Sequence, residues 1–185
     1  MDRAMEVFWR KGYEAASLSD LTAAMGINRP SLYSAFGDKE ALFHKALARY
    51  AEGPSSYLRL ALQEPTARAV AERMMRGAVD VGTDEGTPPG CMWVRGTLSC
   101  GDPGGRLGKQ MAAQRVGGEA TLRKRFDQAA AEGDLPVGTD IAALARYVIA
   151  VNFGVSVLAA TGAKRRALQK VIGLALQAWP SKPSR

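Results

Sequence analysis

Residues 17–42 constrain the fold of this chain more than any other stretch. Ser17 and Asp20 have the spacing of a capping box, which predicts that a helix begins there. Gly26 then supplies a left-handed or tight turn, which a residue with a Cβ resists. Asp38 can cap a further helix. The stretch therefore predicts two short helices joined by a glycine turn and followed by the start of a third.

The second of these helices has one buried face and one outward face. Asn28 is placed to cap it, and Pro30 sits within its first turn, where a missing N–H costs nothing. Leu32 and Phe36 are four residues apart and are expected to face the core. The residues expected to look outward are Arg29, Pro30, Ser31, Tyr33 and Ser34. This is the helix-turn-helix arrangement, whose second helix enters the DNA major groove.

The same segment resembles the N-terminal signature of TetR/AcrR-family transcriptional regulators. The positions that carry the resemblance are Gly12, Tyr13, Ser17, Asp20, Leu21, Gly26, Ile27, Leu32, Tyr33, Phe36, Lys39, Glu40, Ala41 and Leu42. The resemblance implies an all-α protein of about nine helices. It implies a three-helix DNA-binding domain over residues 1–46 and a larger effector-binding and dimerisation domain over residues 47–185.

The resemblance also implies which side chains approach double-stranded operator DNA. Those expected near base edges or at the start of the reading helix are Asn28, Arg29, Pro30, Ser31 and Ser34. Those expected near phosphates are Ser17, Ser19, Tyr33 and Lys39. Arginine can pair with guanine, and hydroxyl groups can contact bases or phosphates. Many family members carry a basic residue followed by an aromatic or His where this chain has Ser34 and Ala35, which predicts a weaker grip on the DNA backbone.

The formal net charge of +7 does not by itself indicate a DNA-binding face. Residues 1–50 hold seven basic and six acidic residues, which almost balance. The positive excess lies in residues 106–125 and in the acid-free stretch 164–185. The prediction of DNA binding therefore rests on the motif and not on the charge.

Two cysteines and one histidine give no metal-binding pattern, so we expect no metal and no cofactor. Cys91 and Cys100 allow a redox-sensor hypothesis, because Arg95 would lie one helical turn from Cys91. A helix would hold the two thiols too far apart for a disulfide. The alternative is that both cysteines are small buried hydrophobic residues.

We expect a cytoplasmic protein with no membrane partner. The longest apolar stretch, Tyr147–Ala160, is too short for a membrane span. The apolar face of the first helix starts almost at Met1, so we expect the natural chain to extend further. Paired carboxylates, a Ser-His-Asp set and a phosphate loop are all missing, which argues against an enzyme. A helical enzyme or an adaptor without DNA binding is the alternative from another functional class.

The last two predicted helices indicate a homodimer. The helix from Asp140 to Thr161 has no polar face from Tyr147 onward, so it needs cover on several sides. Together with a final helix over Ala163–Trp179 it would form a four-helix interface about a two-fold axis. The alternative is a central helix inside a monomer. A dimer would read a palindromic operator.

A small-molecule effector is expected in the helical body. Methionine and aromatic side chains suit a varied apolar or aromatic ligand, and Arg95 would favour an anionic group on it. The candidate residues are Met74, Met75, Met92, Trp93, Arg95, Met111, Phe126, Tyr147, Asn152, Phe153 and Ser156. The alternative is that they form ordinary core.

Two further segments have weaker patterns. A basic helix is predicted over Arg106–Glu132, and its residue Val116 is expected to face inward. The pattern of Tyr57–Leu62 is ambiguous between a continued helix and a separate short helix.

Overall fold

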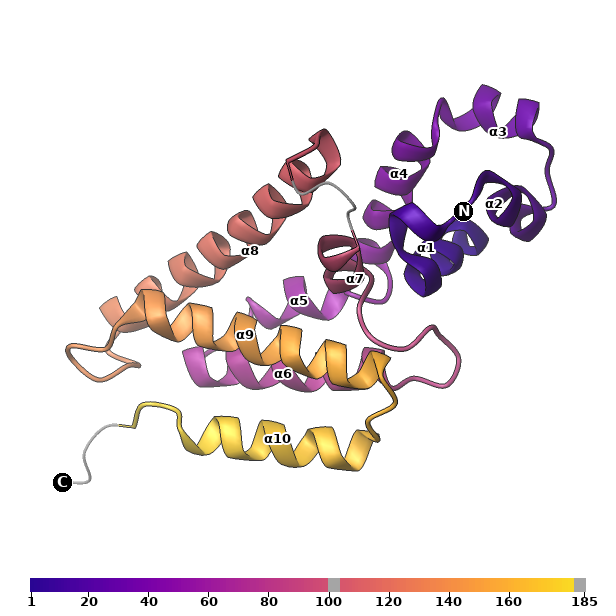
Figure 1. Ribbon diagram of the computed structural model, residues 1–185. Helices are drawn as coiled ribbons and strands as arrows, with labels where there is room; N and C mark the ends of the chain where they lie inside the picture. Colours follow the sequence, from indigo (N-terminus) through magenta and orange to yellow (C-terminus); the bar gives the residue numbers. More distant parts are fainter. Residues whose placement is uncertain (100–103, 182–185) are drawn as a thin grey trace.

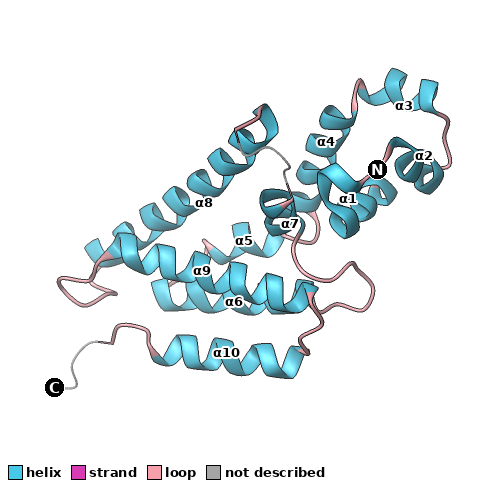
Figure 2. Ribbon diagram, in the orientation of Figure 1, coloured by secondary structure: helices cyan, strands magenta, loops and turns pink. Residues whose placement is uncertain are grey.

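The structure is a computed structural model that describes residues 1–99 and 104–181, and within those ranges every regular element is a helix (Figures 1 and 2). The helices are α1 (Asp2–Ala15), α2 (Leu18–Met25), α3 (Arg29–Phe36), α4 (Lys39–Glu52), α5 (Ser56–Ala61), α6 (Ala67–Gly82), α7 (Met92–Leu98), α8 (Arg106–Ala131), α9 (Ile141–Ala160) and α10 (Arg165–Gln177). The all-α prediction is confirmed. Ten helices are described against about nine expected, and α5 occupies the segment with the ambiguous pattern.

The helices α1 to α4, called the head, lie at one end of the molecule (Figure 1). Their core is aromatic at its centre, where Phe8 meets Phe43 edge to face with ring centroids 5.0 Å apart. Trp9 meets Tyr50 in the same way at 4.7 Å. All four rings are fully buried. This packing joins α1 to α4, and it stabilises helices that would be marginally stable alone.

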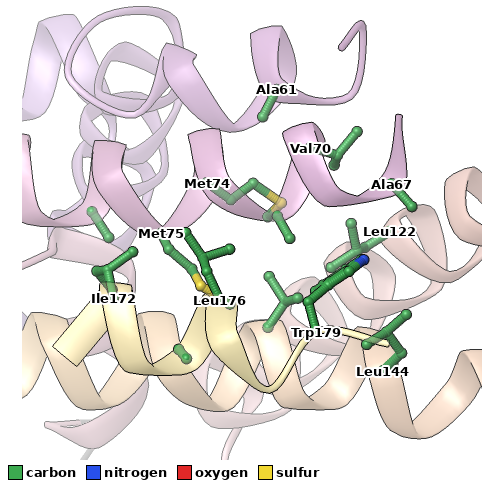
Figure 3. Close-up of a cluster of buried hydrophobic side chains, with 14 of the residues drawn as sticks. Ala61, Ala67, Val70, Met74, Met75, Leu122, Leu144, Ile172, Leu176 and Trp179 are labelled. Atoms are coloured by element: carbon green, nitrogen blue, oxygen red, sulfur yellow. The ribbon is translucent and has the colours of Figure 1, made fainter. Parts of the chain in front are cut away.

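The helices α5 to α10, called the body, form the rest of the described chain. Helices α6, α9 and α10 pack alongside one another, and α8 packs against α9 (Figure 1). Figure 3 shows Met75 of α6 among the side chains between α6 and α10, which include Ile172 and Leu176. Phe126 of α8 meets Trp179 edge to face at 5.7 Å. The body core therefore joins four helices that are distant in sequence.

The middle of α8 is more exposed than its sequence predicts. Val116 is 54% exposed, so the expectation that it turns inward is wrong. All residues from 112 to 118 are exposed, whereas Met111 and Leu122 on either side are buried. The physical reason is that, within the described residues, this turn of α8 has no packed neighbour on the side that carries Val116.

Helix α9 is long and apolar enough to cross a membrane by length and composition alone. It is longer than the apolar stretch Tyr147–Ala160 because it begins at Ile141. In this fold it packs against α6, α8 and α10 as a central helix of the body. Only 28% of the most apolar 18-residue stretch of α9 is buried, so much of the surface of this helix is free for another contact.

Helix α7 connects the head to the body by packing against α1. Gly12 interrupts α1 with φ of 74°, and a Cβ at this position would lie 2.2 Å from Ser99 Oγ. Only glycine accommodates both this backbone and this close approach. The buried core of the head also includes Met92, Leu107 and Met111, which come from α7 and α8. The core of the head therefore extends into two helices of the body, while the body has a separate core of its own.

Candidate functional site

The start of α2 is fixed by the predicted capping box. Ser17 Oγ accepts a hydrogen bond from the Asp20 amide at 3.0 Å, and Asp20 Oδ2 accepts from the Ser17 amide at 3.0 Å. Lys11 Nζ also lies 2.6 Å from Asp20 Oδ1. The Lys11 ammonium and the Ser17 donors lower the pKa of Asp20 from 3.8 to about 2. The carboxylate therefore keeps its charge, and with it both hydrogen bonds, well into acid.

The turn between α2 and α3 has the predicted glycine geometry. Gly26 has φ of 67°, in the left-handed region. The amide of Gly26 donates to Ala23 O at 3.3 Å, and the amide of Ile27 donates to Thr22 O at 3.1 Å. These bonds satisfy carbonyls at the end of α2 and turn the chain into α3.

Helix α3 presents nearly all of its surface to solvent at the far end of the head. Leu32 is its only fully buried residue, and Phe36 is half-buried against the head core. Tyr33 is 47% exposed. The other exposed residues are Arg29, Pro30, Ser31, Ser34 and Ala35. A helix anchored on one narrow face and exposed elsewhere has the geometry required to enter the major groove.

The guanidinium of Arg29 lies across the gap between α3 and α2. Its Nη2 donates to Ser19 Oγ at 3.0 Å. Guanidinium carries five N–H donors, so this bond orients the group and leaves others for a guanine edge or a phosphate. The structure thus brings together Arg29 and Ser19, two of the residues predicted to contact DNA.

Two of the predicted DNA-contacting side chains are engaged in capping. The Ser17 hydroxyl donates to Asp20 Oδ2 at 2.8 Å while it accepts from the Asp20 amide. Asn28 Oδ1 accepts from the Ser31 amide at 2.8 Å. These side chains therefore shape the ends of α2 and α3.

Lys39 stands at the start of α4, where a cation and free helix amides can hold a phosphate. Asp38 caps this helix by accepting from the Ala41 amide at 2.7 Å. The Lys39 ammonium lies 4.5 Å from the centroid of the Tyr13 ring, and it donates to Glu14 O at 3.4 Å. Burial lowers the pKa of Lys39. Lys39 is therefore held against α1, with hydrogens to spare for a phosphate.

A cavity of about 790 Å³ lies in the body between α4, α5, α6, α7, α8 and α9. Six of the predicted effector-binding residues line it: Met74, Trp93, Met111, Asn152, Phe153 and Ser156. The volume is in the range of small-molecule sites in proteins. The structure therefore provides a space in which an apolar ligand of drug size would fit.

The other predicted effector-binding residues lie elsewhere. Met75, Met92 and Phe126 are buried in the cores of the head and body. Tyr147 donates its hydroxyl to Ala175 O at 2.9 Å and thereby ties α9 to α10. The stem of Arg95 lies beside Gly12 of α1, so its charge is not on the cavity wall.

Sequence reasoning missed the walls that α5 and α8 contribute. These residues are Tyr57, Leu58, Leu62, Gly117, Gly118 and Thr121. The Tyr57 ring packs directly on Gly77 of α6, where a Cβ would lie 2.2 Å from Tyr57 Cδ2. A Cβ on Gly117 or Gly118 would meet nothing within 4 Å. The pair Gly117–Gly118 inside α8 is the sequence signal that could have indicated open space beside this turn of the helix.

The cavity is in physical contact with the head. Ala51 and Glu52, the last two residues of α4, line it, while the first turn of α4 lies beside α3. Helix α4 has 14 residues, which is about 21 Å at 1.5 Å per residue. Trp93 and Met111 line the cavity and also pack on the core of the head. The cavity and the core of the head are therefore linked through residues of α4, α7 and α8.

The surroundings of Cys91 do not favour the thiolate form that a redox sensor uses. A sensor needs a lowered pKa, whereas burial raises the pKa of Cys91. Cys91 precedes α7, lines the cavity and packs against the core of the head. Cys100 lies outside the described residues, so its part of the hypothesis is untested.

Metal binding is a separate question from redox sensing. Among described residues, no group of three or more His, Cys, Asp or Glu side chains could hold a metal ion.

A second exposed surface lies on α9 and α10. Large apolar side chains on it are Val157, Leu158, Val171 and Leu174, which are 40%, 46%, 40% and 68% exposed. A Cβ on Gly154 or Gly173 would meet nothing within 4 Å. Apolar groups clustered on two adjacent helices indicate a surface suited to contact with another protein.

Comparison with known proteins gives the same picture of the head. Residues 1–46 match the sequence model of the family described as bacterial regulatory proteins, tetR family. The HTH-type transcriptional repressor ComR of Escherichia coli (strain K12) is 30% identical over 182 residues. The match covers 97% of this chain and 87% of that protein.

Solved structures extend the similarity to the whole fold. A cysteine variant of the TetR-family transcriptional regulator CifR, in complex with 26-bp double-strand operator DNA, is 40% identical with a TM-score of 0.90. The match covers 97% of this chain and 94% of that chain. A TetR regulator of Rhodococcus sp. RHA1 is 44% identical with a TM-score of 0.67 and coverages of 98% and 97%.

Proposed function

The chain belongs to the TetR family of bacterial transcriptional regulators, and from this membership we propose that it is a cytoplasmic repressor released from its operator by a small apolar or aromatic molecule. Like the relatives it matches, the protein is a DNA-binding regulator and not an enzyme. In the proposed arrangement, residues 1–46 read DNA, and residues 47–185 bind the effector and form a homodimer.

The single observation that carries the proposal is the exposure of α3 at the tip of the head. Only Leu32 of this helix is fully buried, and Arg29 is held in place by Ser19. Arg29, Pro30, Ser31 and Ser34 would meet base edges, and Ser19, Tyr33 and Lys39 would meet phosphates. The complex of CifR with operator DNA supports this assignment, because that chain shares 40% identity with this one.

The proposed homodimer uses the exposed face of α9 and α10. Its apolar side chains, Leu174 above all, would leave water on association. Gly154 and Gly173, where a Cβ would meet nothing within 4 Å, would allow the two helix pairs to approach closely. Two heads related by a two-fold axis would read half-sites one helical turn apart, roughly 34–36 Å, or a multiple of it.

The proposed effector site is the cavity of the body. A ligand there would contact Ala51 and Glu52 of α4 together with Trp93 and Met111, which also pack on the head. Because these contacts differ when the head turns, ligand binding would favour one orientation of the heads over another. The paired heads would then no longer match their two half-sites.

The test is binding of the full chain to DNA from upstream of its own gene, measured by fluorescence anisotropy between 50 and 200 mM KCl. The proposal predicts that the upstream fragment is preferred over a coding fragment of the same length. It also predicts that affinity falls steeply with salt, because phosphate contacts release counterions. Equal, salt-insensitive binding of both fragments, or no binding, would contradict it.

A further inference from the structure

Asn152 carries the least compensated polar group of the cavity wall. It lies in the middle of α9, it is 8% exposed, and it lines the cavity. Its Oδ1 is buried, and no donor to it exists within residues 1–99 and 104–181. A buried amide without a partner is unfavourable. The side chain is therefore suited to a partner that the protein does not supply.

The hydroxyl groups of the wall are already used as donors inside the protein. Each serine and threonine hydroxyl donates to a main-chain carbonyl at 2.8–3.1 Å, and these residues are Ser55, Thr97, Thr121 and Ser156. Ser55 Oγ also accepts from Trp93 Nε1 at 3.3 Å. Among the buried side-chain atoms on this wall, within the described residues, Asn152 Oδ1 is thus the one that has no partner.

The part of the wall around Asn152 does not suit a charged ligand group. The residues that α9 contributes are Ile149, Asn152, Phe153 and Ser156, all uncharged. The cationic residues on the wall are Arg59 of α5, which is exposed, and Arg115 of α8, which lies 3.5 Å from Glu119 and is 41% exposed. Arg95 lies beside Gly12, away from the cavity. A carboxylate against α9 would lose its hydration with no cation from that helix to compensate it.

We propose that Asn152 selects a neutral ligand that carries a hydroxyl or amide group on an apolar body. Such a group both donates and accepts, so it pairs with the Asn152 amide whichever way that amide is turned. Met74, Trp93 and Phe153 then surround the apolar part. This inference rests on the proposed function in that it takes the cavity to be the effector site.

The experiment uses three probes with one ring system, namely 2-naphthol, naphthalene and 2-naphthoate. Binding of each to the full chain is measured by equilibrium dialysis at pH 7, where 2-naphthol is neutral. We expect 2-naphthol to bind about tenfold more tightly than either other probe, the effect of one well-formed hydrogen bond. Asn152→Leu should bind 2-naphthol no more tightly than naphthalene.

The matched control is Thr97→Val, which removes a wall hydroxyl that already donates to Trp93 O. This variant should keep the preference for 2-naphthol. If Asn152→Leu does not fold, Asn152→Ala replaces it with the same expectation. Equal affinities for the three probes, tighter binding of 2-naphthoate, no binding, or a preference that survives in the Asn152 variant would overturn the inference. Operator binding without any probe is measured separately and decides the proposed function.

Discussion

Arg106 Nη2 lies 2.7 Å from Glu40 Oε2, so an ion pair ties the first turn of α8 to the first turn of α4. Glu40 is the neighbour of Lys39 at the end of α4 that is expected to face DNA. The pair therefore does two things at once. It joins body to head, and it neutralises a carboxylate close to where phosphates would lie.

Replacing Arg106 should weaken operator binding. In Arg106→Gln the Glu40 carboxylate loses its cation and repels nearby phosphates. We expect a loss of about fivefold in affinity, because Arg106 is 72% exposed and water screens the pair. Fluorescence anisotropy on operator DNA measures it. The double variant Arg106→Gln with Glu40→Gln should recover the affinity, and a double variant as weak as the single one would refute this explanation.

Gly12→Ala should destabilise the protein. Its φ of 74° is unfavourable for alanine, and the new Cβ would lie 2.2 Å from Ser99 Oγ. Backbone strain of this kind costs on the order of 1–3 kcal/mol. The control is Gly117→Ala in α8, where a Cβ meets nothing within 4 Å and should stabilise the helix. Urea denaturation compares the two, and equal stability of both variants would count against the close approach of α1 and α7.

The capping box of α2 should show a characteristic pH dependence. The pKa of Asp20 is lowered from 3.8 to about 2, so its stabilising effect is complete above 3.8 and is lost as the pH falls through 2. We expect the stability difference between the parent and Asp20→Asn to stay constant from pH 7 to 5 and to shrink below pH 4. NMR titration of the Asp20 carboxyl carbon measures the pKa directly. A midpoint at the ordinary value would contradict the three hydrogen bonds to this side chain.

The dimer face can be tested with two leucines of equal exposure. Leu174 on α10 is 68% exposed and Leu98 on α7 is 67% exposed, but only Leu174 lies on the proposed interface. Leu174→Glu should shift the protein from dimer to monomer in analytical ultracentrifugation. Leu98→Glu should leave the dimer intact. A parent protein that sediments as a monomer, or two variants that behave alike, would argue against this interface.

The head could be predicted from sequence because its signals are local. Ser17, Asp20, Gly26 and Asn28 each determine the backbone within three residues, through a cap or a turn, and the structure contains each of these features. Their spacing places α3 on the surface without knowledge of the body. The orientation of Lys39 against Tyr13 was not predictable, because it depends on how α1 packs beside α4.

The cavity could be predicted only in part because its walls come from six helices. Met74 and Met75 are adjacent in sequence and point about 100° apart on α6, so one lines the cavity and the other fills the core. Periodicity shows which face of a helix is apolar. It does not show whether that face meets a neighbour or a hollow, and Val116 was mispredicted for the same reason.

The central claim is that α3 reads DNA sequence, and selection from a random double-stranded DNA pool tests it most directly. The full chain should enrich a palindrome with two equal half-sites. Arg29→Ala should enrich a motif that has lost its preference at one base pair in each half-site, because a bidentate contact to guanine is absent. Enrichment of no palindrome by the parent, or of the unchanged motif by Arg29→Ala, would contradict the account.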